Sequence, residues 1–239
     1  MTSFDDTLPV MMTLAGFISA AVWARAVRDY TLARLPLLQR ETGPVRWDHW
    51  TILAALAVWV AVDMAVASLM RAGGDADFMD RVQASCYAGL GKTTLLILLL
   101  VITASARFQD LLPQPGEWGT DARAAVWGLF ASLLPVWGVS LLIEPLRTSD
   151  NGHAFVRALQ DHPTAPTIAW ITVAVLVAAP LCEELLFRVI LQGWLQDRVA
   201  PATAVVAVAV AFAAIHMNSW PDPLPLVPLS LILGYLYYR

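Results

Sequence analysis

The chain has 239 residues, of which 58% are hydrophobic and only 14% are charged, and its formal net charge is -4. Soluble domains carry about 25% charged residues, so this composition and a mean hydropathy of +0.62 exclude an ordinary soluble globular protein and a disordered one. The sequence has no basic cluster of the kind that nucleic-acid binding requires. Its two cysteines, Cys86 and Cys182, are too far apart for a CxxC metal site and are predicted to be small packing residues.

Runs of predominantly apolar residues recur along the chain at the length of a membrane-spanning helix, which is about 20 residues. The predicted segments are Leu8–Ala24, Trp50–Met70, Tyr87–Ala106, Ala124–Ile143, Thr167–Leu195, Pro201–Met217 and Pro223–Tyr238. Polar or proline-containing stretches separate them. The sequence therefore predicts an all-α fold, a polytopic transmembrane bundle of about seven helices that lies in the lipid bilayer.

Arginines in the connecting stretches predict how the bundle is oriented. If the N-terminus faces outward, the inner loops and the C-terminal tip hold nine arginines and the outer loops hold four. Short loops rich in Lys and Arg stay in the cytoplasm. We therefore expect an outward N-terminus, with the stretch from Arg25 to His49 on the cytoplasmic side.

Two charged residues lie in or near the second and third segments. Asp63 is inside the second segment, where a hydrogen-bonded packing role is expected and a proton-relay or substrate role is the alternative. Lys92 follows Gly89 and Gly91 in a stretch that resembles a phosphate-binding loop, but the required first glycine is replaced by Cys86. Lys92 is predicted to reach from a helix end toward the membrane interface.

Three ionisable residues lie together inside the fifth segment: Glu183, Glu184 and Arg188. At mid-membrane they oppose insertion by about 7–10 kcal/mol in total, so they must face a partner or a wet cavity. Glu184 and Arg188 are four residues apart on one helical face and can pair. Glu183 points about 100° away, toward the face that it shares with Phe187. Pro180, one turn earlier, can kink the helix.

A histidine in the sixth segment is predicted to lie at the same depth. Glu183 precedes Asp197 by 14 residues and His216 follows Pro201 by 15, which places both roughly 21–22 Å from the turn between the two segments. Since a short-linked helix pair is antiparallel, the carboxylate and the imidazole can meet. Phe212 and His216 are four residues apart and share a face.

A glutamate and a histidine inside a membrane suit the activation of water for attack on a carbonyl. A carboxylate in a low-dielectric site can serve as a general base, and a neutral imidazole can bind a metal or stabilise an oxyanion. The alternative is a polar clamp between helices with no chemistry.

Glu183-Glu184-x-x-x-Arg188 followed by Phe212-x-x-x-His216 resembles the EExxxR and FxxxH motifs of the CPBP family of membrane proteins. This family includes CAAX prenyl endopeptidases and bacteriocin-immunity (Abi) proteins. The Ala-Pro before the glutamates and Phe187 before Arg188 also fit the pattern, and the final Leu-Gly-Tyr-Leu-Tyr-Tyr-Arg resembles the approach to the family's last motif. The resemblance divides one membrane domain into N-terminal helices and loops, 1–166, and a CPBP-like catalytic core, 167–239.

The resemblance implies an intramembrane endopeptidase of the CAAX-processing type, acting on a membrane-anchored or lipidated peptide. Glu183 would activate water, and His216 would bind a divalent metal such as Zn²⁺ or face the oxyanion. Glu184 and Arg188 would orient the site. Phe187 and Phe212 would pack beside it or bind substrate.

The family's third motif, a histidine followed four residues later by asparagine, would lie on a further helix, and no histidine follows His216. We therefore expect either a shortened chain or a degenerate member. A non-catalytic immunity or scaffold protein of the same fold is the alternative function. A small transporter or proton relay using Asp63, Glu183 and Glu184 is a third hypothesis. We expect the protein in the plasma membrane of a bacterium, with a site open to the cytoplasm.

Overall fold

The structure is a computed structural model that describes residues 4–31, 45–72, 74, 77–103, 118–147, 159 and 163–238. These residues form helices and no strand. The helical elements, in chain order, are α1 (Phe4–Thr31), α2 (His49–Ala72), α3 (Phe78–Thr103), α4 (Trp118–Ile143), η2 (Glu144–Leu146), α6 (Ala165–Val173), η4 (Ala174–Ala178), α7 (Ala179–Glu184), η5 (Leu185–Gln192), α8 (Gly193–Gln196), α9 (Pro201–Ala214), η6 (Met217–Ser219) and α10 (Pro223–Tyr238). The predicted all-α fold of about seven helices is confirmed.

Five helices of the described chain are long and apolar enough to cross a membrane. They are Pro9–Thr31, His49–Arg71, Phe78–Thr103, Trp118–Leu146 and Ala165–Gln196. Large apolar side chains along them are exposed, among them Ile102 at 77% and Leu142 at 79%. Such a surface requires lipid around it, so the chain is an integral membrane protein. The predicted sixth and seventh segments form shorter apolar helices, α9 and α10.

The chain divides into two compact units, each built from separate stretches of sequence. One unit contains residues 1–43, 113–147 and 201–239 and therefore α1, α4, α9 and α10. The other contains residues 44–112 and 148–200 and therefore α2, α3 and the helix from α6 to α8. The predicted division of the chain near residue 166 stays a prediction.

In the first unit, a proline explains how α1 is joined to α4. Pro135 inside α4 has no N–H, so the carbonyl of Ala131 one turn earlier loses its helical donor. The indole Nε1 of Trp23 on α1 donates to this carbonyl at 2.9 Å. Beside it, the Leu134 amide donates to Ser19 Oγ at 3.2 Å. The α10 helix packs against both α4 and α9.

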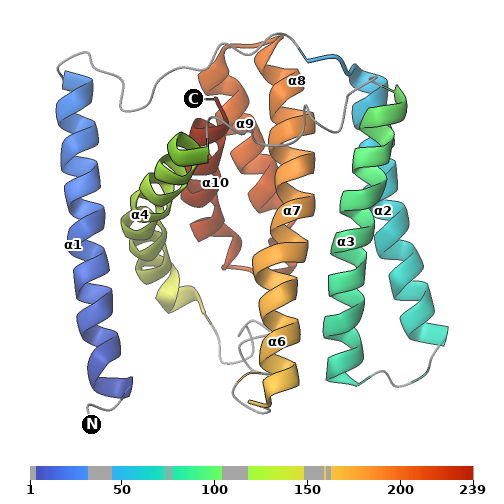
Figure 1. The fold of residues 1–239 in the computed structure, drawn as a ribbon, viewed down its shortest axis with the longest axis horizontal. Helices are drawn as coiled ribbons and strands as arrows, with labels where there is room; N and C mark the ends of the chain where they lie inside the picture. The colour runs from blue at the N-terminus through green and yellow to red at the C-terminus, as the bar shows by residue number, and fades with distance from the viewer. Residues whose placement is uncertain are drawn as a thin grey trace. The chain divides into compact units, whose positions relative to one another are not determined.

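In the second unit, α3 lies between α2 and the long helix from α6 to α8 and contacts both (Figure 1). The segment before α2 is joined to the far end of that helix. Val45 donates its amide to Asp197 Oδ2 at 2.9 Å, and the Trp47 indole donates to the Ile190 carbonyl at 2.9 Å.

Several helix boundaries differ from the predicted ones. The first helix continues to Thr31, beyond the predicted end at Ala24, and Asp29 there accepts ion pairs from Arg25 and Arg28 at 3.6 and 3.2 Å. These two arginines were expected in a loop and instead belong to α1.

The third helix begins at Phe78, nine residues before the predicted start. Asp77 and Asp80 cap this end reciprocally, each carboxylate accepting the other residue's amide at 2.8 and 3.2 Å. Lys92 therefore lies in the interior of α3 and is only 7% exposed. The prediction that Lys92 reaches the interface from a helix end is wrong.

Candidate functional site

The acidic motif lies on a helix whose hydrogen bonding changes twice. Between Ala165 and Gln196 the helix is continuous, but η4 and η5 are π-helical. At the end of η4 the Ala179 amide donates to the Ala174 carbonyl, five residues back. Pro180 follows at once and cannot donate, so the predicted local disturbance takes the form of a π-turn. Such turns occur frequently at functional sites.

Glu184 and Arg188 form the ion pair that their spacing predicts. Arg188 Nε lies 3.3 Å from Glu184 Oε2. The arginine side chain is 1% exposed and the glutamate side chain 41%, so the pair runs from the interior of the unit toward its surface. A buried guanidinium is costly without a carboxylate partner, and Glu184 therefore serves first to hold Arg188.

Glu183 lies at the end of α7, next to this pair, and is half-buried. Its neighbour Cys182 is buried and has a free thiol, as does Cys86, which confirms that both cysteines are packing residues. Phe187, one helical turn after Glu183, is 4% exposed. Its ring meets the ring of Trp59 on α2 edge to face, with centroids 6.3 Å apart.

The histidine of the second motif follows α9 and does not lie within it. The helix ends at Ala214, three residues before the predicted end, and the His216 amide donates to the Ala213 carbonyl at 3.0 Å in a tight turn. The predicted contact with Phe212 is present, because the two ring centroids are 5.0 Å apart.

The ring orientation of His216 is fixed by a hydrogen bond of 2.8 Å between Nδ1 and the carbonyl of Phe212. Because a carbonyl oxygen only accepts, Nδ1 is the donor in this hydrogen bond. In a neutral ring the lone pair is then on Nε2. Metal-binding histidines commonly make this bond with their second nitrogen. Phe212 is buried. It holds His216 in two ways, through the contact between the rings and through its backbone carbonyl.

An ion-pair network anchors the turn that follows His216. Arg147, after α4, donates from Nη1 to Glu144 at 2.8 Å and from Nε to Asp222 at 3.0 Å. These hydrogen bonds raise the pKa of the Arg147 guanidinium above its ordinary value, and the bond to Glu144 has the largest effect. The network joins the end of α4 to the segment between His216 and α10.

Glu183, Glu184, Phe187 and Arg188 lie in one unit, and Phe212 and His216 lie in the other. The structure thus brings together the members of each motif. The meeting of Glu183 with His216 stays a prediction.

One charged pair in the membrane was not predicted as a pair. Lys92 Nζ on α3 lies 2.6 Å from Asp63 Oδ1 on α2 and 4.0 Å from the centroid of the Trp59 ring. The sequence does show one acidic and one basic residue in neighbouring apolar segments. An unpaired charge inside a membrane is costly, so these two residues could have been expected to pair.

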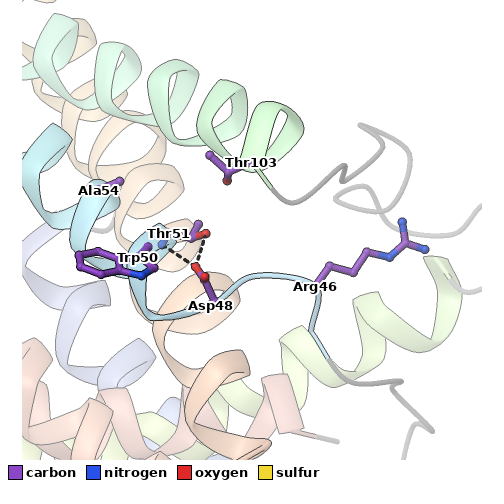
Figure 2. Close-up of a pocket in the computed structure, with 6 residues that line it drawn as sticks. All are labelled: Arg46, Asp48, Trp50, Thr51, Ala54 and Thr103. Atoms are coloured by element: carbon purple, nitrogen blue, oxygen red, sulfur yellow. Dashed lines mark hydrogen bonds between the residues drawn. The ribbon is translucent and has the colours of Figure 1, made fainter.

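A cavity of about 410 Å³ opens at the start of α2 and is lined by Arg46, Asp48, Trp50, Thr51, Ala54 and Thr103 (Figure 2). Asp48 caps α2 by accepting from the Thr51 amide at 3.0 Å and from its hydroxyl at 3.2 Å. The hydrogen bond from the Thr51 amide lowers the pKa of the Asp48 carboxyl below its ordinary value. None of the predicted site residues lines this cavity.

Within the described residues, no three His, Cys, Asp or Glu side chains gather into a metal-binding group. His216 is one candidate ligand, because its Nδ1 makes the backing hydrogen bond that metal-binding histidines commonly make. A divalent metal would need further ligands, which the described residues do not gather, so the predicted metal stays a prediction.

The family model of the Rce1-like type II CAAX prenyl endopeptidases matches residues 165–239 of the chain. The match includes both motifs and begins at α6, which confirms the resemblance to CPBP proteases over this stretch. No curated protein and no solved structure matches the chain.

Proposed function

We propose that the protein is an intramembrane endopeptidase of the CAAX-processing type, which cleaves membrane-anchored or lipidated peptides near their C-terminus. The observation that carries the proposal is the position of Glu183. It is a half-buried carboxylate beside the Glu184–Arg188 pair, on a membrane helix inside the matched stretch.

In this proposal Glu183 is the general base that takes a proton from water, and the resulting hydroxide attacks the scissile carbonyl. Glu184 holds Arg188 and so maintains the acidic turn. Phe187 and Phe212, each beside its own motif, would bind substrate or serve in packing. The carboxylate can later return its proton to the leaving amine.

His216 has two candidate roles, and its tautomer favours one of them. With the proton on Nδ1, the neutral ring has a lone pair and no proton at Nε2, so it can bind a metal but cannot donate to an oxyanion. We therefore propose His216 as a ligand of a divalent metal such as Zn²⁺. When bound, the metal would polarise the carbonyl and stabilise the developing charge.

We further propose that the substrate enters from the cytoplasmic side of a bacterial plasma membrane. The arginine distribution in the sequence supports this orientation, and lipidated protein substrates are attached to membrane surfaces.

The test is cleavage of a panel of prenylated CAAX-type and unmodified transmembrane peptides by the purified protein in lipid vesicles. The wild type is compared with Glu183→Gln, which keeps the shape of the side chain and removes its charge. We expect product only from the wild type, with equal thermal unfolding temperatures. Equal cleavage by both would exclude the role of Glu183. No cleavage by either would favour the non-catalytic immunity or scaffold protein.

A further inference from the structure

The ion pair between α2 and α3 lies outside both motifs but inside the membrane-spanning segments. Lys92 Nζ contacts Asp63 Oδ1 at 2.6 Å, and the lysine side chain is 9% exposed whereas the aspartate side chain is 53% exposed. The positive end of the pair is thus buried in the unit and the negative end is at its surface. Charged groups inside a membrane are rare and usually functional.

Three contacts fix how α3 lies along the helix that carries the glutamates. Val82 packs with Ile171, and Cys86 packs with Ala174 and Ala178. Partner numbers rise together along both helices, so the two helices run parallel.

The closest approach comes one turn later, at Gly89. A Cβ on Gly89 would lie 2.9 Å from the backbone carbon of Ala178. One more turn along each helix leads from Gly89 to Lys92 and from Ala178 to Cys182. Lys92 is therefore level with Cys182 and with Glu183, which follows it.

The α2 helix contributes a ring that contacts both Lys92 and the helix carrying the glutamates. Lys92 Nζ lies over the Trp59 ring at 4.0 Å, and the same ring meets Phe187 edge to face. A cation over an indole face is stabilised further when water is excluded. The Lys92 ammonium thus has Asp63 and Trp59 of α2 as its contacts, and the helix that carries it packs against α7.

We propose that Lys92 is a positioning residue of the Glu183 site, whose buried ammonium, oriented by Asp63 and Trp59, holds the turn carrying Glu183 and offsets the negative charge of its carboxylate. This role rests on the proposed function. On its own helix Glu183 has Glu184 and Arg188 as charged neighbours. Lys92, with its partner Asp63, lies at the level of Glu183 on the neighbouring helices α3 and α2.

Three variants separate the charge of Lys92 from the mere presence of a pair. Lys92→Met removes the cation, Asp63→Asn keeps it, and the exchange Asp63→Lys with Lys92→Asp keeps the pair but reverses it. We expect Lys92→Met and the exchange to lower kcat about tenfold or more with KM changed less than twofold. Asp63→Asn should lower kcat much less. A fourth variant, Lys92→Arg, keeps the cation and should retain most of the activity.

Thermal unfolding of each variant in detergent identifies a loss that is only structural. If the pair served packing alone, Asp63→Asn would lose as much activity as Lys92→Met, and the exchange would restore both stability and kcat. Either result would overturn the proposal. Should Lys92→Met fail to fold, the comparison of Asp63→Asn with the exchange variant decides.

A second readout needs no peptidase activity. A hydrophobic carbodiimide modifies protonated carboxyl groups, and mass spectrometry measures the modified fraction of Glu183 at pH 7. We expect severalfold more modification in Lys92→Met than in the wild type, and no increase in Asp63→Asn. If modification changes in this way but the wild type cleaves nothing, the proposed function fails and the electrostatic role stands. Unchanged modification with unchanged kcat overturns the role of Lys92.

Discussion

Gly89 on α3 and Ala178 on η4 bring two membrane helices into backbone contact. A Cβ on Gly89 would lie 2.9 Å from both the carbonyl carbon and the carbonyl oxygen of Ala178, and 3.1 Å from its Cβ. Small residues permit such close approaches between membrane helices. The contact lies one turn before Lys92 on one helix and one turn before Cys182 and Glu183 on the other, so it places these residues at the same level along the two helices.

We therefore predict that Gly89→Ala destabilises the protein by about 1–3 kcal/mol, because the new methyl group must push backbone away rather than the tip of a flexible side chain. Gly91→Ala is the matched control, since no atom lies within 4 Å of a Cβ at that position. Thermal unfolding in detergent measures both. Equal unfolding temperatures for the two variants would contradict the close contact.

The ion pair of Glu184 with Arg188 predicts that a double variant is less destabilised than a single one. Glu184→Gln removes the Glu184 ion pair from a guanidinium that is 1% exposed, at a cost of at most about 3–5 kcal/mol. Adding Arg188→Met to Glu184→Gln removes the buried charge, and we expect this double variant to be more stable than Glu184→Gln alone. Unfolding measurements on the two single variants and the double variant give the coupling energy. A coupling near zero would mean that the pair contributes nothing.

The sequence predicted the parts of the site that depend on spacing along one helix. Glu184 and Arg188 pair because residues four apart share a face, and Phe212 meets His216 for the same reason. Contacts that depend on the register between helices were missed. The pairing of Lys92 with Asp63 depends on the register between α2 and α3. The early capped start of α3 at Asp77 and its close approach to η4 at Gly89 are two further features that hydropathy does not indicate.

Local hydrogen bonding also lay beyond the sequence pattern. Pro180 predicted a disturbance, but a missing donor can produce a kink or a π-turn, and the choice depends on packing around η4. Likewise, the end of α9 at Ala214 places His216 in a turn, whereas the continuous apolar run predicted a helix to Met217.

The tautomer of His216 predicts a dependence on metal. If Nε2 binds a divalent cation, treatment with a chelator should abolish peptide cleavage, and Zn²⁺ added back should restore it. His216→Ala should be inactive with or without Zn²⁺. Metal content of the purified protein, measured by mass spectrometry, should fall in His216→Ala relative to the wild type. Full activity after removal of all metal would instead assign His216 another role.

The ion pairs of Arg147 predict an effect on His216 from outside the membrane-spanning segments. Arg147 joins Glu144 at the end of α4 to Asp222, which follows the turn that begins at His216. The Arg147 side chain is 36% exposed, so its loss should cost little stability, about 0.2–1 kcal/mol. We expect Arg147→Gln and Asp222→Asn to lower kcat severalfold by loosening that turn, and the double variant to lose no more than either single one. Glu144→Gln leaves the bond to Asp222 in place and serves as the control. Peptide cleavage and thermal unfolding measured together test this, and losses in the single variants that add in the double variant would show that the two residues act separately.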